Sequence, residues 1–589
     1  MSYQVQTRFR EALPETFAEE LLSYQMQDRP VHHISLLKER ARKDIATLEQ
    51  HLRAQGYFSA QVQYIFQTTP QGIVLLFDVQ PGDAFILEEI QLLEVNTREP
   101  LPLLVPLTRR FANQRNTLAL LTQIEQKALN RLKKKGFPMA ELKNKELIVD
   151  HTQKKTKFQC LIETGPRVFF GPVTFVGADA LPATFLRNRV TFREGSLFDA
   201  REIEATRQAL IATKLFSSVK IEVAQKADKH SLIPIKIKVG MIPTHLLSLG
   251  GRFSTYKAAA GQDWWRGIKG KVSLTKFNPF GCGDQMRVSL SGSPPTYTNL
   301  HGEGATRYNF AVSGDLMEPD VFSAGYTLIT RGTFLQETTI GFFRYGFTAE
   351  TFLDIPLKTI LRFTIGPTIE SFRVEGRGVH LYNLVGFSSE MVLDTTDNAL
   401  NPKRGICLSL GLHPQGGSIM QPDKSTQRGL CLIKERLSVY CPLDRSGNYV
   451  IAGWTHLRQV LWQKFEHIPT DKRLYAGGNH SVRGYALQYA GPLDAAQQHP
   501  VGGRSVWEGG GELRLRLVGQ LSGIFFIESA KVSQSLFPKL AHDWFTGLGL
   551  GFCYLTEIGP LRVDIARPLR IRPKIDAKLQ LMISIGQTL

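Results

Sequence analysis

The 589-residue sequence has no apolar run that approaches the roughly 18 uncharged residues of a membrane-spanning helix. It has only six cysteines and no Cys-x-x-Cys pair, which argues against structural zinc and thioredoxin-like chemistry. The motifs G-x-G-x-x-G, G-x-S-x-G and H-E-x-x-H are also absent, so nucleotide-binding, lipase and metalloprotease sites have no support. We therefore expect no catalytic residue, no cofactor and no metal.

The N-terminus lacks the apolar segment of a signal peptide, and residues 1–7 read as a strand instead. The formal charge of +18 is unevenly distributed: residues 1–100 hold 9 basic and 14 acidic side chains, whereas residues 101–167 hold 14 and 5. No groove-reading module accompanies the basic stretch, so we expect no nucleic-acid partner. The stretch is either a solvated face or a docking surface for an acidic partner or anionic lipid.

The first 243 residues repeat one unit three times. Residues 52–58 (Leu-Arg-Ala-Gln-Gly-Tyr-Phe) recur as residues 132–138 and, more weakly, as residues 210–216. Each copy follows a helical pattern and precedes a strand-like sequence. The helical patterns cover residues 33–54, 117–135 and 199–213. Helices packed on a small sheet bury such faces, which predicts α+β modules of about 75–80 residues.

From about residue 244 the hydrophobic period changes from 3.6 to 2, and short alternating runs follow one another between turn residues. About ten residues per run suits a tilted strand that crosses a membrane. Sixteen such strands are predicted, near residues 244–255, 267–276, 284–293, 306–315, 322–332, 335–345, 357–367, 379–393, 405–413, 431–440, 447–460, 505–518, 522–532, 545–556, 560–568 and 578–588.

The alternation has two possible readings. Residues 512–517 place Glu and Arg on one face and leucine on the other, and residues 561–566 alternate in a similar way. In a soluble sandwich the apolar face points inward; in a large barrel it points to lipid and the polar face to a wet lumen. Periodicity does not separate the two, but the strand count and the lack of an interrupting helix favour the barrel.

Residues 473–485 hold the most specific motif, inside a segment of about 45 residues between two predicted strands. Its end, Val482-Arg483-Gly484-Tyr485, resembles the (V/I)-R-G-(F/Y) tip of the sixth extracellular loop in the BamA/TamA superfamily. The surrounding Leu-Tyr-Ala-Gly-Gly-x-x-Ser is most similar to the TamA branch.

Other segments resemble the same superfamily. Residues 526–532 correspond to its F-x-D-x-G pattern, with Glu528 for Asp and Ala530 for Gly. Residues 547–569 are similar to its final hairpin, and residues 401–405 to its N-P-x-R-G feature. The N-terminal repeats resemble POTRA domains, and three of them fit TamA.

The resemblance and the periodicity together predict three POTRA-like domains at residues 1–83, 84–166 and 167–243. A transmembrane barrel of about 16 antiparallel strands then covers residues 244–589. This architecture implies an outer-membrane location with the POTRA domains in the periplasm, and we expect the export signal to lie outside this sequence.

Arg483 is the predicted anchor of the long loop. A guanidinium offers five fixed donors that can pair carboxylates bidentately. Glu512 and Glu528 lie on the polar face of the next two strands, where the family pattern places lumenal acids. We therefore predict that Arg483 pairs with one or both; the alternative is an arginine solvated at the surface.

The resemblance also implies a weak seam. In this superfamily the first barrel strand (244–255 here) closes against the last (578–588) with few hydrogen bonds. Gly250, Gly251 and Gly586 are expected to weaken packing there. A poorly paired edge can template an incoming strand.

The function implied is TamA-like assembly or translocation of outer-membrane proteins, such as autotransporters. The partners implied are unfolded clients, outer-membrane lipid and a TamB-like periplasm-spanning protein, and the alternative activity implied is support of lipid traffic with that protein. Two rival hypotheses are a two-partner-secretion pore, which would need a plug helix, and a soluble multi-domain β binding protein. The chain departs from the family in ending with Leu589 rather than an aromatic residue.

Overall fold

The computed structural model describes most of the chain, and its N-terminal and C-terminal parts form two separate compact units. Unit 1 comprises residues 1–178 and 189–241, and unit 2 comprises residues 179–188 and 242–589. The described residues are 3–9, 21–26, 33–70, 72–257, 264–293, 308–376, 378–421, 424–494, 499–538, 543–556, 559–573 and 575–585.

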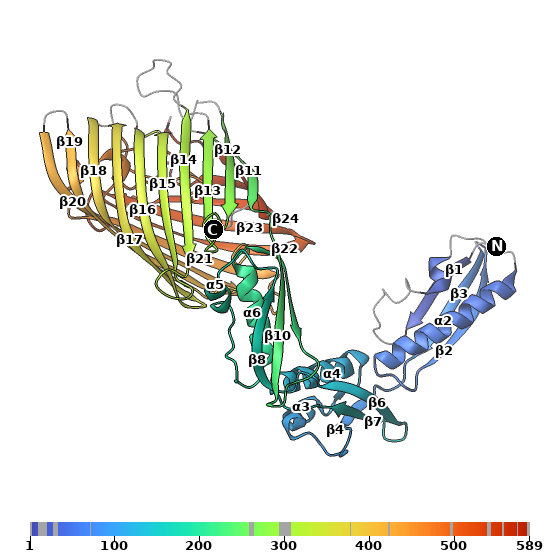
Figure 1. Ribbon diagram of the computed structural model, residues 1–589. Coiled ribbons are helices and arrows are strands. Elements are labelled where there is room, and N and C mark those ends of the chain that lie inside the picture. Colours follow the sequence, from blue (N-terminus) through green and yellow to red (C-terminus); the bar gives the residue numbers. More distant parts are fainter. Residues whose placement is uncertain are drawn as a thin grey trace. The chain divides into compact units, whose positions relative to one another are not determined.

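Unit 1 contains three small sheets with helices (Figure 1). The first sheet has the order β1-β3-β2, with β1 parallel to β3, and the other two have the orders β5-β4-β7-β6 and β8-β10-β9. The strands are β1 (Tyr3–Phe9), β2 (Gln61–Thr69), β3 (Gly72–Gln80), β4 (Ile86–Glu94), β5 (Gln114–Arg115), β6 (Glu141–Asp150), β7 (Lys155–Glu163), β8 (Phe169–Val176), β9 (Phe216–Val223) and β10 (Leu232–Met241).

The three predicted helices are present with nearly the predicted bounds, as α2 (Ile34–Ala54), α4 (Leu118–Lys133) and α6 (Ala200–Ala212). α4 starts at the Thr117 cap, whose hydroxyl accepts the backbone N–H of Leu120 at 3.1 Å. The residues on its inner face recur at helical spacing, and they are fully or nearly fully buried. Shorter helices are α1 (Leu22–Gln25), α3 (Val105–Phe111) and the 3₁₀ turn η2 (Pro102–Leu104). α5 (Ala183–Arg187) belongs to unit 2.

The free cysteines give a direct test of burial. Cys160 on β7 is fully buried in the core of the second module, and burial raises the pKa of its thiol to about 12. Cys282, in the turn after β12, is exposed. Because the thiolate is the reactive form, Cys282 should react with a maleimide at pH 8 within minutes. Cys160 should react only after unfolding, as read by mass spectrometry of labelled peptides. Rapid labelling of Cys160 in the folded protein would contradict this packing.

Unit 2 is built on one sheet of sixteen antiparallel strands in sequence order, β11 to β26 (Figure 1). The strands are β11 (His245–Lys257), β12 (Trp264–Phe277), β13 (Gln285–Ser293), β14 (Asn309–Pro319), β15 (Thr327–Thr338), β16 (Phe343–Lys358), β17 (Leu361–Gly376), β18 (Gly378–Asp394), β19 (Gly405–Gln421), β20 (Lys424–Pro442), β21 (Tyr449–Leu461), β22 (Ser505–Val518), β23 (Leu521–Ser533), β24 (Phe545–Thr556), β25 (Gly559–Pro568) and β26 (Gln580–Ile585).

All sixteen predicted strands have a counterpart, but several predicted bounds are wrong. The run predicted at 335–345 corresponds to β16 at Phe343–Lys358, and the run at 357–367 corresponds to β17 at Leu361–Gly376. β16 to β20 have 16 to 19 residues each, more than a bilayer requires. Strands that extend beyond the membrane have no lipid boundary to mark their ends in the sequence.

The sheet has its apolar side chains outside. Along β24, Leu548, Leu550 and Phe552 are exposed, whereas the glycines between them are buried. Buried charged groups, among them Glu512 and Glu528, lie on the inner side. This arrangement is the reverse of a soluble sandwich and is the one a barrel in lipid requires. In the part of the chain that the structure describes, no helix is both long and apolar enough to cross a membrane.

Candidate functional site

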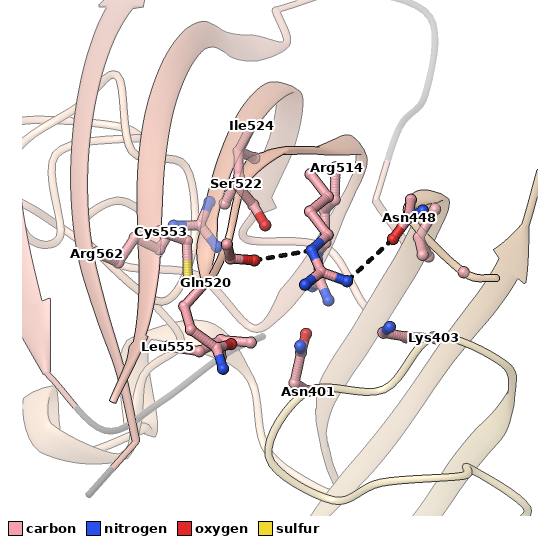
Figure 2. Close-up of a pocket in the computed structure, with 14 residues that line it drawn as sticks. Asn401, Lys403, Asn448, Arg514, Gln520, Ser522, Ile524, Cys553, Leu555 and Arg562 are labelled. Atoms are coloured by element: carbon pink, nitrogen blue, oxygen red, sulfur yellow. Dashed lines mark hydrogen bonds between the residues drawn. The ribbon is translucent and has the colours of Figure 1, made fainter. Parts of the chain in front are cut away.

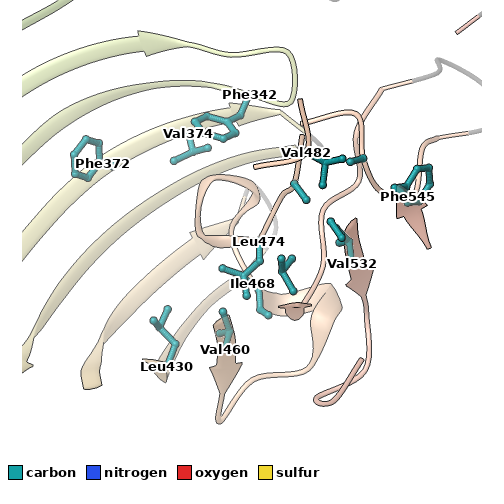
Figure 3. Close-up of a cluster of buried hydrophobic side chains, with 14 of the residues drawn as sticks. Phe342, Phe372, Val374, Leu430, Val460, Ile468, Leu474, Val482, Val532 and Phe545 are labelled. Atoms are coloured by element: carbon teal, nitrogen blue, oxygen red, sulfur yellow. The ribbon is translucent and has the colours of Figure 1, made fainter. Parts of the chain in front are cut away.

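The segment between β21 and β22, residues 462–504, is called the inner loop here, and its described residues, 462–494 and 499–504, fold into the barrel. Apart from the 3₁₀ turns η3 (Phe465–His467) and η4 (Thr470–Lys472), its described residues form no helix or named strand. Figure 3 shows Ile468, Leu474 and Val482 of the inner loop between side chains of the barrel wall. The hydrophobic cluster comprises Phe342, Phe372, Val374, Tyr382, Leu384, Ile419, Leu430, Val460, Ile468, Leu474, Ala476, Val482, Tyr485, Ala490, Val506, Ala530, Val532 and Phe545.

Arg483 lies at the centre of the buried polar contacts of the inner loop. Its Nη2 donates to Glu512 Oε1 at 2.8 Å and to Glu528 Oε1 at 2.5 Å. Its Nη1 donates to Asp564 Oδ2 at 2.9 Å, and its Cζ lies 3.5 Å from the centre of the Phe526 ring. The structure thus places the predicted arginine beside both predicted acids and adds a third.

Glu528 holds the backbone of the inner loop as well as its side chain. Its Oε2 accepts the backbone N–H of Arg483 at 2.9 Å, while its Oε1 accepts Nε, also at 2.9 Å. The carboxylate therefore binds both the backbone N–H and the guanidinium of Arg483, and this fixes the position of the two groups together. The longer Glu side chain, where the family pattern has Asp, supplies reach to this position.

Two further arginines complete a six-residue charge network. Arg562 donates to Glu512 Oε1 at 2.5 Å and to Asp564 Oδ2 at 2.7 Å. Arg514 Nε donates to Glu512 Oε2 at 3.1 Å. All six side chains are buried, and their formal charges balance: three arginines face three acids. Buried charges need this pairing, since an uncompensated one is costly.

The sequence analysis missed Asp564, Arg562 and Arg514 as members of the network. The sequence did contain a sign of them, because these residues lie on the polar face of the alternating patterns that correspond to β22 and β25. Pairing of Cys553 with Arg562 and of Gly551 with Asp564 brings these charges inward beside the network. The alternation gives the face of each residue, but only the strand register gives its neighbours.

Three glycines of β24 make room for the network. A Cβ on Gly547 would lie 2.9 Å from the backbone N of Gly484, and one on Gly551 would lie 2.0 Å from Asp564 Oδ1. A Cβ on Gly549 would lie 2.3 Å from Cζ of Phe526, the ring under Arg483. The glycine row of β24 therefore allows close approach of the inner loop, a function that strand glycines often serve.

The rest of the predicted motif is also in contact with the barrel. Gly484 passes close to β24, and a Cβ on it would lie 3.0 Å from Gly547 Cα. Tyr485 is buried and donates its hydroxyl to Arg570 O at 2.7 Å, while Val482 lies in the hydrophobic cluster. The four motif residues thus touch both the polar network and the apolar cluster.

Additional contacts hold the inner loop to other strands. Glu508 on β22 accepts a hydrogen bond from Ser481 and another from Arg458 Nη2, the latter at 2.7 Å. Asp471 Oδ2 accepts the hydroxyl of Tyr382 on β18 at 2.6 Å. The inner loop is therefore tied to β18 as well as to β22, β23 and β25.

The two terminal strands of the sheet lie next to each other, with Cα atoms within 8 Å. β11 has thirteen residues paired with β12, in which Gly250 is opposite Lys271 and Gly251 opposite Gly270. β26 has six described residues, all paired with β25. Among the residues that the structure describes, no ladder joins β11 to β26. Gly586, the third predicted seam glycine, lies outside the described residues.

The described residues contain no group of three or more His, Cys, Asp or Glu side chains that could hold a metal. The cysteines among them form no disulfide. The buried acids of the charge network instead have arginine partners. This chemistry can hold a loop in position, and nothing in it activates a nucleophile or a water molecule.

The comparisons with known proteins agree with this geometry. The model of the Omp85 superfamily domain matches residues 278–589, and the POTRA model, described as surface antigen variable number repeat, matches residues 168–240. The chain is similar to the crystal structure of BamA from Haemophilus ducreyi lacking POTRA domains 1–3. The two are 15% identical over 85% of this chain and 100% of that chain, with a TM-score of 0.61. It also matches CdiB from Acinetobacter baumannii at 14% identity, over 94% of this chain and 99% of that chain, with a TM-score of 0.48.

Proposed function

Because this chain belongs to the Omp85 superfamily, we propose that it inserts other proteins into the outer membrane as a TamA-like assembly factor. The prediction of POTRA modules followed by a barrel of 16 antiparallel strands is confirmed. The barrel is in the outer membrane, the POTRA modules are in the periplasm, and the protein is not an enzyme. The soluble binding-protein hypothesis is therefore wrong.

The seam between β11 and β26 is the observation that carries the proposal. Among the described residues β11 and β26 approach each other without a hydrogen-bonded ladder, whereas β19 and β20 pair along seventeen residues of β19. A Cβ on Gly250 would be 3.9 Å from its nearest neighbours, and one on Gly251 would have nothing within 4 Å. These two glycines are therefore not required by crowding, and because neighbouring strand residues face opposite sides, they leave β11 thinly packed on both of its faces.

A poorly paired strand in lipid favours any partner that satisfies its backbone. Unpaired N–H and C=O groups cost several kcal/mol each in hydrocarbon, where no water can replace the missing bond. An unfolded client strand can supply these bonds by adding to the edge of β11. The seam then serves as both the template and the exit into the membrane.

The inner loop has a supporting role in this proposal. Val482, Arg483, Gly484 and Tyr485 hold it against the strands that lead to β26. With Arg483 bound to β22, β23 and β25, this part of the wall keeps its register while the seam opens. The rigid wall confines the movement to β26 and β11.

The POTRA modules provide further edges for partners. β6 (Glu141–Asp150) is an edge strand of its sheet, and most of its ten residues are exposed. We infer that unfolded clients and a TamB-like periplasm-spanning protein bind such edges by strand addition. Co-purification of a TamB-like protein with the full chain from solubilised membranes supports this partner, and its loss when Ile148 is replaced by proline supports the β6 edge.

The seam proposal predicts a site-specific cross-link. A photoreactive residue at Leu249 of β11, which is 76% exposed, should capture an autotransporter β-domain during its assembly in outer-membrane vesicles. The same residue at Val385 of β18, which is 61% exposed, should not, because β18 is paired on both sides. We expect at least a tenfold difference in cross-linked product on gels.

Equal capture at Leu249 and Val385 would contradict a specific seam. Capture only from a position inside the barrel, such as Ser409 of β19, would instead favour the two-partner-secretion pore. In that alternative the client passes through the lumen, and locking the seam leaves transport unchanged.

A further inference from the structure

A cavity of about 310 Å³ opens within the barrel, next to the charge network (Figure 2). This is at the lower end of the range for small-molecule sites, about 300–1,000 Å³. It lies among the turns that join β18 to β19, β20 to β21 and β22 to β23, the barrel end at which the chain enters from β10. The lining residues are Asn401, Lys403, Gly447, Asn448, Val450, Arg514, Arg516, Gly519, Gln520, Ser522, Ile524, Cys553, Leu555 and Arg562.

The charged lining of this turn cavity is entirely basic in the part of the chain that the structure describes. Lys403, Arg514, Arg516 and Arg562 contribute to it, and no carboxylate does. Two turn acids are absent from the lining: Asp397 accepts the backbone N–H of Lys403 at 2.9 Å, and Asp444 accepts that of Tyr449, also at 2.9 Å. Several cations around one concave site create a positive field that attracts an anion.

The charge network does not absorb these cations completely. Its three acids are matched by Arg483, Arg514 and Arg562, so Lys403 and Arg516 are in excess. Arg516 donates to two neutral oxygens, Gly519 O at 2.8 Å and Asn448 Oδ1 at 3.2 Å. Neutral acceptors orient this guanidinium without cancelling its charge.

Arg514, which lines this cavity, carries an unused donor. The residue is 8% exposed, and its Nε and Nη1 donate to Glu512 Oε2 and Pro402 O. Its Nη2 is buried and has no hydrogen-bond partner in the structure. A buried charged donor without an acceptor is more costly than an unsatisfied neutral group, so an acceptor from a ligand would relieve this cost.

We propose that the turn cavity binds a phosphate group. Phosphate offers several strong acceptor oxygens, which suit the Nη2 of Arg514, the ammonium of Lys403 and the guanidinium of Arg516 together. Amide and hydroxyl donors such as Gln520 and Ser522 can bind the remaining oxygens. Figure 2 shows Lys403, Arg514 and Gln520 around the same space.

The apolar part of the lining indicates that the phosphate is esterified. Val450, Ile524 and Leu555 also line the cavity, and they would contact the organic group and not the charged oxygens. The carrier can be a glycerophospholipid headgroup or a soluble phosphate ester, since both present the same chemistry at the periplasmic mouth of the barrel. Either source gives the protein a ligand site separate from the seam.

Titration calorimetry on the full chain in a non-ionic detergent tests the proposal. The probes are inorganic phosphate, glycerol 3-phosphate, and dihexanoyl phosphatidylglycerol below its micelle concentration. The double variant Lys403→Gln/Arg516→Gln should weaken binding at least tenfold. Arg445→Gln is the matched control, because Arg445 is an exposed turn arginine outside the lining. Its affinity should stay within twofold of wild type. Gel mobility before and after heating confirms that each variant is folded.

The probes distinguish the two sources. At least tenfold tighter binding of the lipid than of glycerol 3-phosphate identifies a headgroup, and comparable binding identifies a soluble ester; both outcomes support a phosphate site. No binding of any probe overturns the proposal. Equal loss in the double variant and in Arg445→Gln also overturns it, as does preference for a peptide with a free C-terminal carboxylate over all three probes.

Discussion

Replacement of Arg483 by alanine should destabilise the inner loop by about 3–5 kcal/mol, the cost of breaking a buried ion pair from one side. The variant leaves Glu512, Glu528 and Asp564 facing only two arginines, and it removes every side-chain bond between residue 483 and the barrel. The loop backbone should then become accessible. Limited proteolysis in detergent should cleave within residues 462–504 at least a hundredfold faster than in the wild type.

Two variants separate charge from geometry. Arg483→Lys keeps the charge but has no planar fork, so it should recover only part of the loss. Arg373→Ala removes an arginine whose side chain is about half exposed and pairs with Glu375, and it should change stability by less than about 1 kcal/mol. A wild-type cleavage rate in Arg483→Ala would show that the apolar cluster and the other polar contacts hold the inner loop without Arg483.

Replacement of Gly549 by valine should be the most damaging single change in the glycine row. A Cβ there would lie 2.3 Å from Phe526 Cζ and 2.4 Å from Ile565 O, so both a ring and a neighbouring strand would have to move. Displacement of Phe526 also removes the surface under Arg483. We expect a loss of at least about 3 kcal/mol, the upper part of the usual range for overpacking, measured by urea unfolding in detergent.

The matched control is Gly332→Val on β15. A Cβ at Gly332 has nothing within 4 Å, and valine suits an exposed strand position in lipid. Its stability should equal or exceed that of the wild type. Equal effects at positions 332 and 549 would mean that backbone freedom, and not close approach, explains the β24 glycines.

The sequence predicted the fold well because the repeat, the helical period and the two-residue period are local signals. α2, α4 and α6 begin and end within two residues of their predicted bounds. The middle barrel strands were placed less well because polar residues continue beyond the lipid boundary in β16 to β20. There, alternation persists without a turn signal to end it.

The site was predicted in part. Arg483, Glu512 and Glu528 could be named because one loop motif and two strand faces pointed to them. Asp564 and Arg562 also lay on a polar face, but their approach to Arg483 depends on the register between β24 and β25. The space for the loop depends on glycines, whose absent side chains give no periodic signal. Packing and strand register could therefore not be predicted from the sequence.

The bond between Arg483 and Asp564 joins residues 81 positions apart and requires β25 to be in place. The inner loop emerges before β22, so its arginine has no complete set of acids until nearly the whole wall has been laid down. During the protein's own biogenesis, docking of this loop is therefore a late event that reports completion of the C-terminal strands. A barrel stalled before that point would present an undocked loop, a feature that quality-control proteases could recognise.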